Sequence, residues 1–121
     1  MASNKNSGLA AVRYATALMD VAHDSKKIDS VEKDLNELEA MIAGSEDLQQ
    51  LIRSPLLSRE QQIEAITAIA KKAKFQDITS NFLALLAENR RLPMLQNMIN
   101  AAKMDISKRR GEIAADVKSA F

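Results

Sequence analysis

The segment Ile78-Thr-Ser-Asn-Phe-Leu-Ala-Leu-Leu-Ala-Glu88 decides the fold class, because a helix of this sequence is apolar on almost every side. At about 100° per residue, its apolar side chains cover roughly 200° of the helix circumference. Its polar side includes Ser80, Asn81 and Glu88. A helix with so wide an apolar arc needs other elements around it, so the segment predicts a helical domain rather than an isolated surface helix.

A second segment, from Leu9 to about Asp24, has the same excess of apolar surface. Its apolar arc reaches about 220°, and its polar side chains crowd one narrow side that includes Arg13 and Asp20. One core cannot cover an arc of that width. Two explanations stay open: the two helices form the centre of a six-helix bundle, or one side of each remains exposed and accepts a helix from another protein.

Four further helices are predicted from apolar spacing and from the residues that interrupt it. They cover residues 28–44, 45–55 and 93–111, together with a helix that begins at Ser58. The chain is therefore predicted to be all-α, with one six-helix bundle over residues 9–110 and a flexible lead-in over residues 1–8. Residues 111–121 lose the helical spacing after Gly111, so we expect a short non-helical C-terminal tail there.

Several helix ends carry recognisable capping signals. Ser45 precedes two acidic residues, which favour the positive N-terminus of a helix. Ser58, with Gln61 three residues later, matches a capping box. Gly44 is the expected C-cap of the helix over residues 28–44. Asp77 or Thr79 is the expected cap of the helix that contains the first segment, and the acidic run within residues 32–39 is expected to be a solvated helix face.

The composition excludes most kinds of chemical site. Among the 121 residues there is no cysteine, one histidine (His23) and three widely spaced glycines. These counts exclude a disulfide framework, a cysteine nucleophile, a histidine pair for a metal and a glycine-rich phosphate loop. No segment approaches the roughly 20 apolar residues of a membrane span. The sequence therefore predicts no enzyme, no catalytic or metal-binding residue and no cofactor.

Basic residues gather where three of the predicted helices end. Cations near a helix C-terminus interact favourably with the helix dipole, which explains all three clusters without a ligand. An RNA- or DNA-binding bundle that uses these clusters is the alternative function, although the formal net charge is only +1. The clusters are Lys71, Lys72 and Lys74; Arg90 and Arg91; and Lys108, Arg109 and Arg110.

Three strings of the sequence carry a family resemblance. Arg13-Tyr-Ala-Thr-Ala-Leu18 and Asn81-Phe-Leu-Ala-Leu-Leu-Ala-Glu-Asn-Arg-Arg-Leu92 lie on the two unusually apolar helices. Arg110-Gly-Glu112, followed by Ala115-Asp-Val-Lys-Ser-Ala120, lies near the end of the chain. Together they resemble the delta subunit of F-type ATP synthase, a family that includes the mitochondrial oligomycin sensitivity-conferring protein.

The resemblance implies a mechanical role. In that family a six-helix N-terminal bundle sits on top of the catalytic head, and a groove between its first and fifth helices holds an amphipathic N-terminal helix of an α subunit. A second region binds the b subunits of the peripheral stalk, so that the head does not turn with the rotor. The positions carried over to this groove are inferred from helical wheels: Tyr14, Ala17, Leu18 and Val21 on the first helix, and Phe82, Leu85 and Leu86 on the fifth.

The chain departs from the family pattern at its end, because family members continue for several dozen residues beyond the point that corresponds to Phe121. We interpret it as the helical domain of a longer protein, in which the α-subunit groove is intact and the stalk-binding region is missing. The N-terminus has no Arg-rich amphipathic transit segment. The expected location is therefore peripheral, at the cytoplasmic face of a bacterial inner membrane, with the matrix side of the mitochondrial inner membrane as the alternative.

Overall fold

The computed structural model describes the backbone of residues 2–119 and the side chains of residues 8–111, and every regular element in it is helical. This confirms the prediction of an all-α fold. The elements are α1 (Ala2–Asp24), α2 (Ile28–Gly44), α3 (Glu46–Arg53), α4 (Arg59–Lys72), α5 (Asp77–Glu88), the short 3₁₀ helix η1 (Leu92–Met94) and α6 (Leu95–Ser119).

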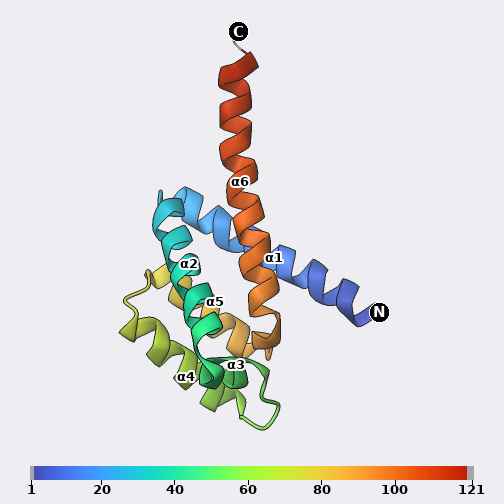
Figure 1. Cartoon of the computed structure of the whole chain (residues 1–121), viewed down its shortest axis with the longest axis vertical. Coiled ribbons are helices and arrows are strands. Elements are labelled where there is room, and N and C mark those ends of the chain that lie inside the picture. The colour runs from blue at the N-terminus through green and yellow to red at the C-terminus, as the bar shows by residue number, and fades with distance from the viewer. Residues whose placement is uncertain (1, 120–121) are drawn as a thin grey trace.

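Helix α5 lies inside the bundle, as its wide apolar arc requires. It packs against α1, α2 and α4, while α1 crosses α6 and packs against it (Figure 1). Leu83, Leu86 and Ala87 of α5 are at most 1% exposed. Helix α1 contributes a buried stripe of its own to the same core: Ala11, Ala15, Leu18, Met19 and Ala22.

The predicted caps of α3 and α4 are confirmed. The Ser45 hydroxyl accepts a hydrogen bond from the Leu48 amide at 3.2 Å. At the start of α4, Ser58 Oγ accepts from the Gln61 amide at 3.1 Å, and the Gln61 side chain accepts from the Ser58 amide at 2.8 Å. Both pairs satisfy backbone donors that the first turn of a helix leaves without a partner.

The cap of α5 differs from the prediction. Neither Asp77 nor Thr79 caps this helix from within; a carboxylate of α2 does so instead. Asp34 Oδ2 accepts a hydrogen bond from the Gln76 amide and another from Thr79 Oγ1, both at 2.8 Å. Asp34 is only 6% exposed, so the prediction that the whole acidic run is a solvated face is wrong at this position. Long-range capping leaves no local sequence signal, because the two partners are 42 and 45 residues from Asp34.

Three helices end with a basic residue in the left-handed conformation. Lys26, Lys74 and Arg90 have φ values of 58°, 60° and 59°, whereas no glycine in the described chain has a positive φ. The amide that follows each of them donates back to a carbonyl five residues earlier, at 2.7 to 3.0 Å. This is the Schellman motif, in which glycine is the usual residue. The predicted C-cap of α2 is wrong by one residue: Gly44 is the last helical residue, without a positive φ, and Ser45 is the C-cap.

Both chain ends differ from the sequence-based expectation. Helix α1 begins at Ala2, where a flexible lead-in over residues 1–8 was expected, and α6 runs through Gly111 to Ser119, where a non-helical tail over residues 111–121 was expected. A glycine inside a helix costs about 1 kcal/mol relative to alanine, which favourable neighbours can offset. Residues 1, 120 and 121 lie outside the described backbone. The two end segments extend past the rest of the bundle (Figure 1).

Candidate docking surface

Helices α1 and α5 pack against each other, and each leaves apolar side chains exposed. Val21 on α1 and Leu85 on α5 are 42% and 37% exposed, and Ala17, one turn before Val21 on α1, is exposed as well. Tyr14 and Phe82 are half-buried and pack on the core beside them. We call these five residues the α1–α5 surface. They are five of the seven residues that the sequence analysis assigned to a partner-binding groove.

The other two predicted groove residues, Leu18 and Leu86, belong to the core and not to the surface. Leu18 is 1% exposed and Leu86 is fully buried. On α1 the buried stripe runs through Ala15, Leu18 and Ala22, so Leu18 faces inward, and on α5 Leu86 is flanked by the equally buried Leu83. A helical wheel gives the width of an apolar arc but not which part of it faces the core. These two leucines therefore support the surface from beneath.

A polar contact joins α1 and α5 at one edge of this surface. Asn89, which follows α5, donates a hydrogen bond from Nδ2 to the Tyr14 hydroxyl at 2.9 Å. The bond fixes the phenol of Tyr14 and ties the end of α5 to the middle of α1. The sequence analysis did not single out Asn89, and no local pattern could have done so, because the two residues are 75 positions apart.

Helix α1 exposes apolar side chains on a second side, toward α6. Leu9, Val12 and Met104 are 62%, 52% and 74% exposed. Val12 and Met104 also line a hollow of about 460 Å³ between α1 and α6. The 220° arc of α1 is thus divided among a buried stripe and two exposed sides. One part of the wide apolar arc is therefore buried in the core, and another part is exposed.

The basic clusters at the ends of α5 and α6 are largely engaged within the fold. Arg90 donates from Nη1 to the Leu57 carbonyl at 2.7 Å. The guanidinium groups of α6 bind carboxylates at 2.7 to 2.9 Å: Arg109 binds Asp105 and Asp20, and Arg110 binds Glu32 and Asp29. These hydrogen bonds raise the pKa values of both arginines, mainly through Asp105 for Arg109 and through Glu32 for Arg110. Such pairs fasten α6 to α1 and α2, which weakens the case for a phosphate-binding surface.

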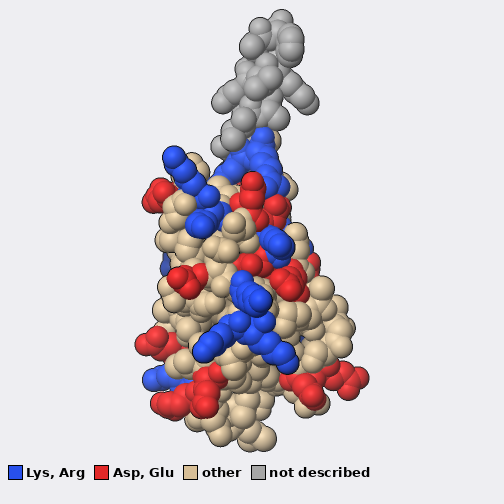
Figure 2. Space-filling model, turned by 90° about the vertical axis from the view of Figure 1, so that its left-hand side faces the viewer, with Lys and Arg blue, Asp and Glu red and all other residues tan. Residues whose placement is uncertain are grey.

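The charged surface has a mixed character. Figure 2 shows acidic and basic side chains interspersed over one face, with lysine and arginine side chains gathered near its middle. The α4 lysines Lys71, Lys72 and Lys74 are exposed. A nucleic-acid interface would require a continuous basic stripe with few acids along it. No observation on the described residues favours that alternative over the structural explanation of the clusters.

The described residues offer no catalytic or metal centre. No three carboxylate or histidine side chains among them converge in a way that could hold a metal ion. The exposed side chain of His23 lies 3.7 Å from the Asp24 carboxylate. Within the described part of the chain, no helix combines the length and the apolar character that crossing a bilayer demands.

Comparison with known proteins gives consistent matches. The family model described as ATP synthase delta (OSCP) subunit matches residues 10–121. The ATP synthase subunit delta of Brucella ovis is 49% identical over 110 residues, which cover 91% of this chain and 59% of that protein. The Brucella anthropi protein of the same name is 47% identical over the same length. The chain thus spans little more than half the length of these curated relatives.

A solved structure shares the fold. One chain in the cryo-EM structure of the Toxoplasma gondii mitochondrial ATP synthase hexamer superimposes with a TM-score of 0.71 at 32% sequence identity. The match covers 75% of this chain and 51% of that chain. The helical arrangement described above therefore also occurs in a protein that was solved within an assembled ATP synthase.

Proposed function

The chain belongs to the ATP synthase delta (OSCP) subunit family, and from this premise we propose that its bundle is a non-catalytic docking module of the ATP synthase stator. The module links the α₃β₃ catalytic head to the peripheral stalk. It thereby resists rotation of the head while proton flow turns the rotor. No chemistry is required of the module for this role, which suits a chain with no cysteine and a single histidine.

The proposed partner of the α1–α5 surface is the amphipathic helix at the N-terminus of an α subunit. The observation that carries this proposal is the set of apolar side chains that adjoining helices leave exposed, above all Val21 at 42% and Leu85 at 37%. A helix laid across them would bury its own apolar face in the manner of helix-in-groove recognition. Ala17, which has the smallest side chain of the surface, would let the foreign backbone come close.

The stalk would be held by a different part of the protein. Its b subunits are assigned to the region that follows the bundle in the longer relatives, of which this chain covers 59%. In the assembled complex the bundle would then stand on the head, peripheral to the membrane. Helix α6, whose last residue is Ser119, would lead from the bundle toward that region.

Titration of the 121-residue chain with a synthetic peptide of the α-subunit N-terminus tests the proposal. We expect saturable binding that Ala17→Arg or Leu85→Arg weakens at least about tenfold, which corresponds to 1.4 kcal/mol. Met104→Arg is the matched control, because Met104 is 74% exposed but lies on α6, away from the α1–α5 surface. Absence of saturable binding, or equal effects of all three substitutions in folded protein, would contradict the proposal.

A further inference from the structure

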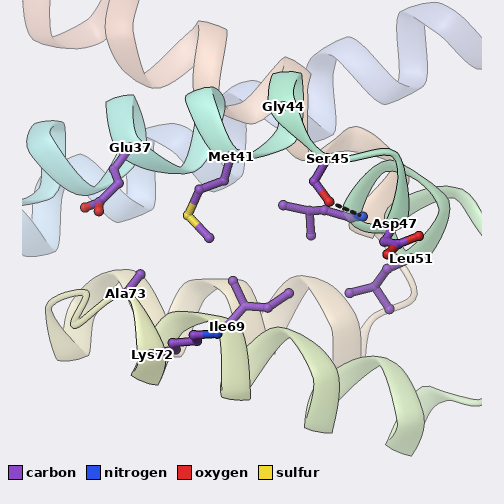
Figure 3. A pocket seen from close by; sticks show the side chains of 10 residues that line it. Glu37, Met41, Gly44, Ser45, Asp47, Leu51, Ile69, Lys72 and Ala73 are labelled. Atoms are coloured by element: carbon purple, nitrogen blue, oxygen red, sulfur yellow. Dashed lines mark hydrogen bonds between the residues drawn. The ribbon is translucent and has the colours of Figure 1, made fainter.

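A second apolar hollow lies on other elements of the bundle, between α2 and α3 on one side and α4 on the other. Its volume is about 660 Å³. Met41, Leu48 and Leu51 line it from α2 and α3, and Ile69 and Ala73 line it from α4 and the residue that follows (Figure 3). We call it the α2–α4 trough. It shares no residue with the α1–α5 surface, so both can be occupied at once.

The two helices that flank the trough, α2 and α4, both pack on α5. In Figure 3 the two helices run on opposite sides of the trough, and the Met41 and Ile69 side chains point into the space between them. Both side chains are half-buried and reach the core only in part. A helix added over the trough would cover both side chains.

The rim of the trough has an excess of negative charge. Glu37 on α2 and Asp47 on α3 are exposed, and neither takes part in an ion pair among the described side chains. Lys72 is the one cation among the described lining residues. Glu37 lies near one end of the trough and Asp47 near the other (Figure 3). Two carboxylates at opposite ends suit a ligand that carries a cation at each end of an apolar face.

From this arrangement we propose that the α2–α4 trough binds a helical segment of a partner protein with a leucine-like apolar stripe and a basic residue at each end of that stripe. The apolar side chains would fill the space between Met41 and Ile69. The two basic residues would meet Glu37 and Asp47. This inference does not depend on the proposed α-subunit contact, because the residues involved are different.

Methyl resonances of the methionines in the intact 121-residue chain provide the assay. The probe is a synthetic amidated helix about 18 residues long, since shorter peptides are marginal helices in water. It carries leucines at i, i+4 and i+7 and a lysine at each end of that face. We expect a saturable shift of the Met41 methyl and none at Met104, an equally methyl-bearing but 74% exposed side chain outside the trough. A matched peptide with glutamates in place of the lysines should bind at least tenfold more weakly.

Charge reversal on the protein distinguishes a specific site from nonspecific apolar binding. In the double variant Glu37→Lys, Asp47→Lys, the preference should invert, so that the glutamate peptide binds more tightly than the lysine peptide. Both positions are exposed, and a thermal melt verifies that the variant is folded. Equal shifts at Met41 and Met104, or an unchanged preference in the folded double variant, would overturn the proposal. Ala17→Arg should leave the Met41 titration unchanged, whatever it does to α-subunit peptide binding.

Discussion

Removing the Asp34 carboxylate should destabilise the bundle more than any other single acidic substitution on α2. Asp34 is 6% exposed and accepts two hydrogen bonds of 2.8 Å, from the Gln76 amide and from Thr79 Oγ1. A hydrogen bond to a charged group contributes about 1.5–3 kcal/mol, so the two together set an upper bound near 6 kcal/mol. The Thr79 hydroxyl can turn to a carbonyl of its own helix, which recovers part of the loss. We therefore expect Asp34→Ala to lower the free energy of unfolding by about 2–4 kcal/mol.

Two companion variants separate the causes of this loss. Asp34→Asn keeps an oxygen that can accept both bonds and loses only their charge assistance, so we expect a smaller loss of about 1 kcal/mol. Glu37→Ala is the matched control, because Glu37 is exposed on the same helix and makes no side-chain hydrogen bond among the described residues. The free energy of unfolding of Glu37→Ala should stay within about 0.5 kcal/mol of that of the unsubstituted protein.

Urea unfolding followed by circular dichroism measures these differences. For a chain of this size the expected loss corresponds to a fall in melting temperature of roughly 4 °C per kcal/mol. Hydrogen exchange at the Gln76 amide should also accelerate in Asp34→Ala, because that amide loses its acceptor. The reasoning would be refuted by an Asp34→Ala variant no less stable than Glu37→Ala, or by Gln76 exchange that does not change.

Three further predictions concern single groups. Lys74→Gly should raise the free energy of unfolding by about 1 kcal/mol, because glycine takes a φ of 60° without strain. Arg90→Gly should raise it by less, since this variant also loses the 2.7 Å hydrogen bond from the guanidinium to a carbonyl. Equal increases for the two variants in urea unfolding would contradict this prediction. Gln62→Met should be neutral or stabilising by up to about 1 kcal/mol, because it removes a buried Oε1 that has no partner among the described residues and loses only the long 3.3 Å hydrogen bond from Nε2 to the Ser54 carbonyl; a clear loss of stability would contradict this. The pKa of Glu39 lies below its ordinary 4.5 because of its hydrogen bond from Lys103. Its contribution to stability is therefore complete above pH 4.5 and disappears as the pH falls through the lowered pKa. Glu39→Gln should remove the loss of stability that protonation of Glu39 causes. A free energy of unfolding that depends on pH below 4.5 in the same way in this variant would contradict the prediction.

The helical elements were predictable because their signals are local. The capping box of Ser58 and Gln61 spans one helical turn, and the apolar spacing of α5 is legible within a dozen residues. The prediction was wrong at both chain ends, where α1 includes Gly8 and α6 continues through Gly111. Neither has a positive φ, and an added Cβ would meet nothing within 4 Å at either position. Each glycine is simply tolerated inside a helix.

The candidate surface was predictable only in part, because exposure depends on contacts between distant segments. Periodicity indicated too much apolar surface on α1 and α5, and five of the seven assigned residues do reach the surface. It could not separate Leu85, which is 37% exposed, from the adjacent Leu86, which is fully buried. The polar contacts that fix these helices were missed for the same reason. Asp34 and Asn89 each find their partners more than 40 positions away.

These contacts imply that the α1–α5 surface is formed before any partner arrives. Asp34 holds the N-terminus of α5, and the Asn89 bond to Tyr14 holds its C-terminal end against α1. Neither contact involves Ala17 or Leu85, so substitutions of these two residues and of Asp34 should affect binding and folding differently. Ala17→Arg and Leu85→Arg should change peptide affinity while leaving the free energy of unfolding nearly unchanged. Asp34→Ala should lower the free energy of unfolding. It should weaken peptide binding only if α5 itself is locally unfolded in the variant. If the surface formed only on binding, the peptide affinity and the free energy of unfolding would instead change together in every variant.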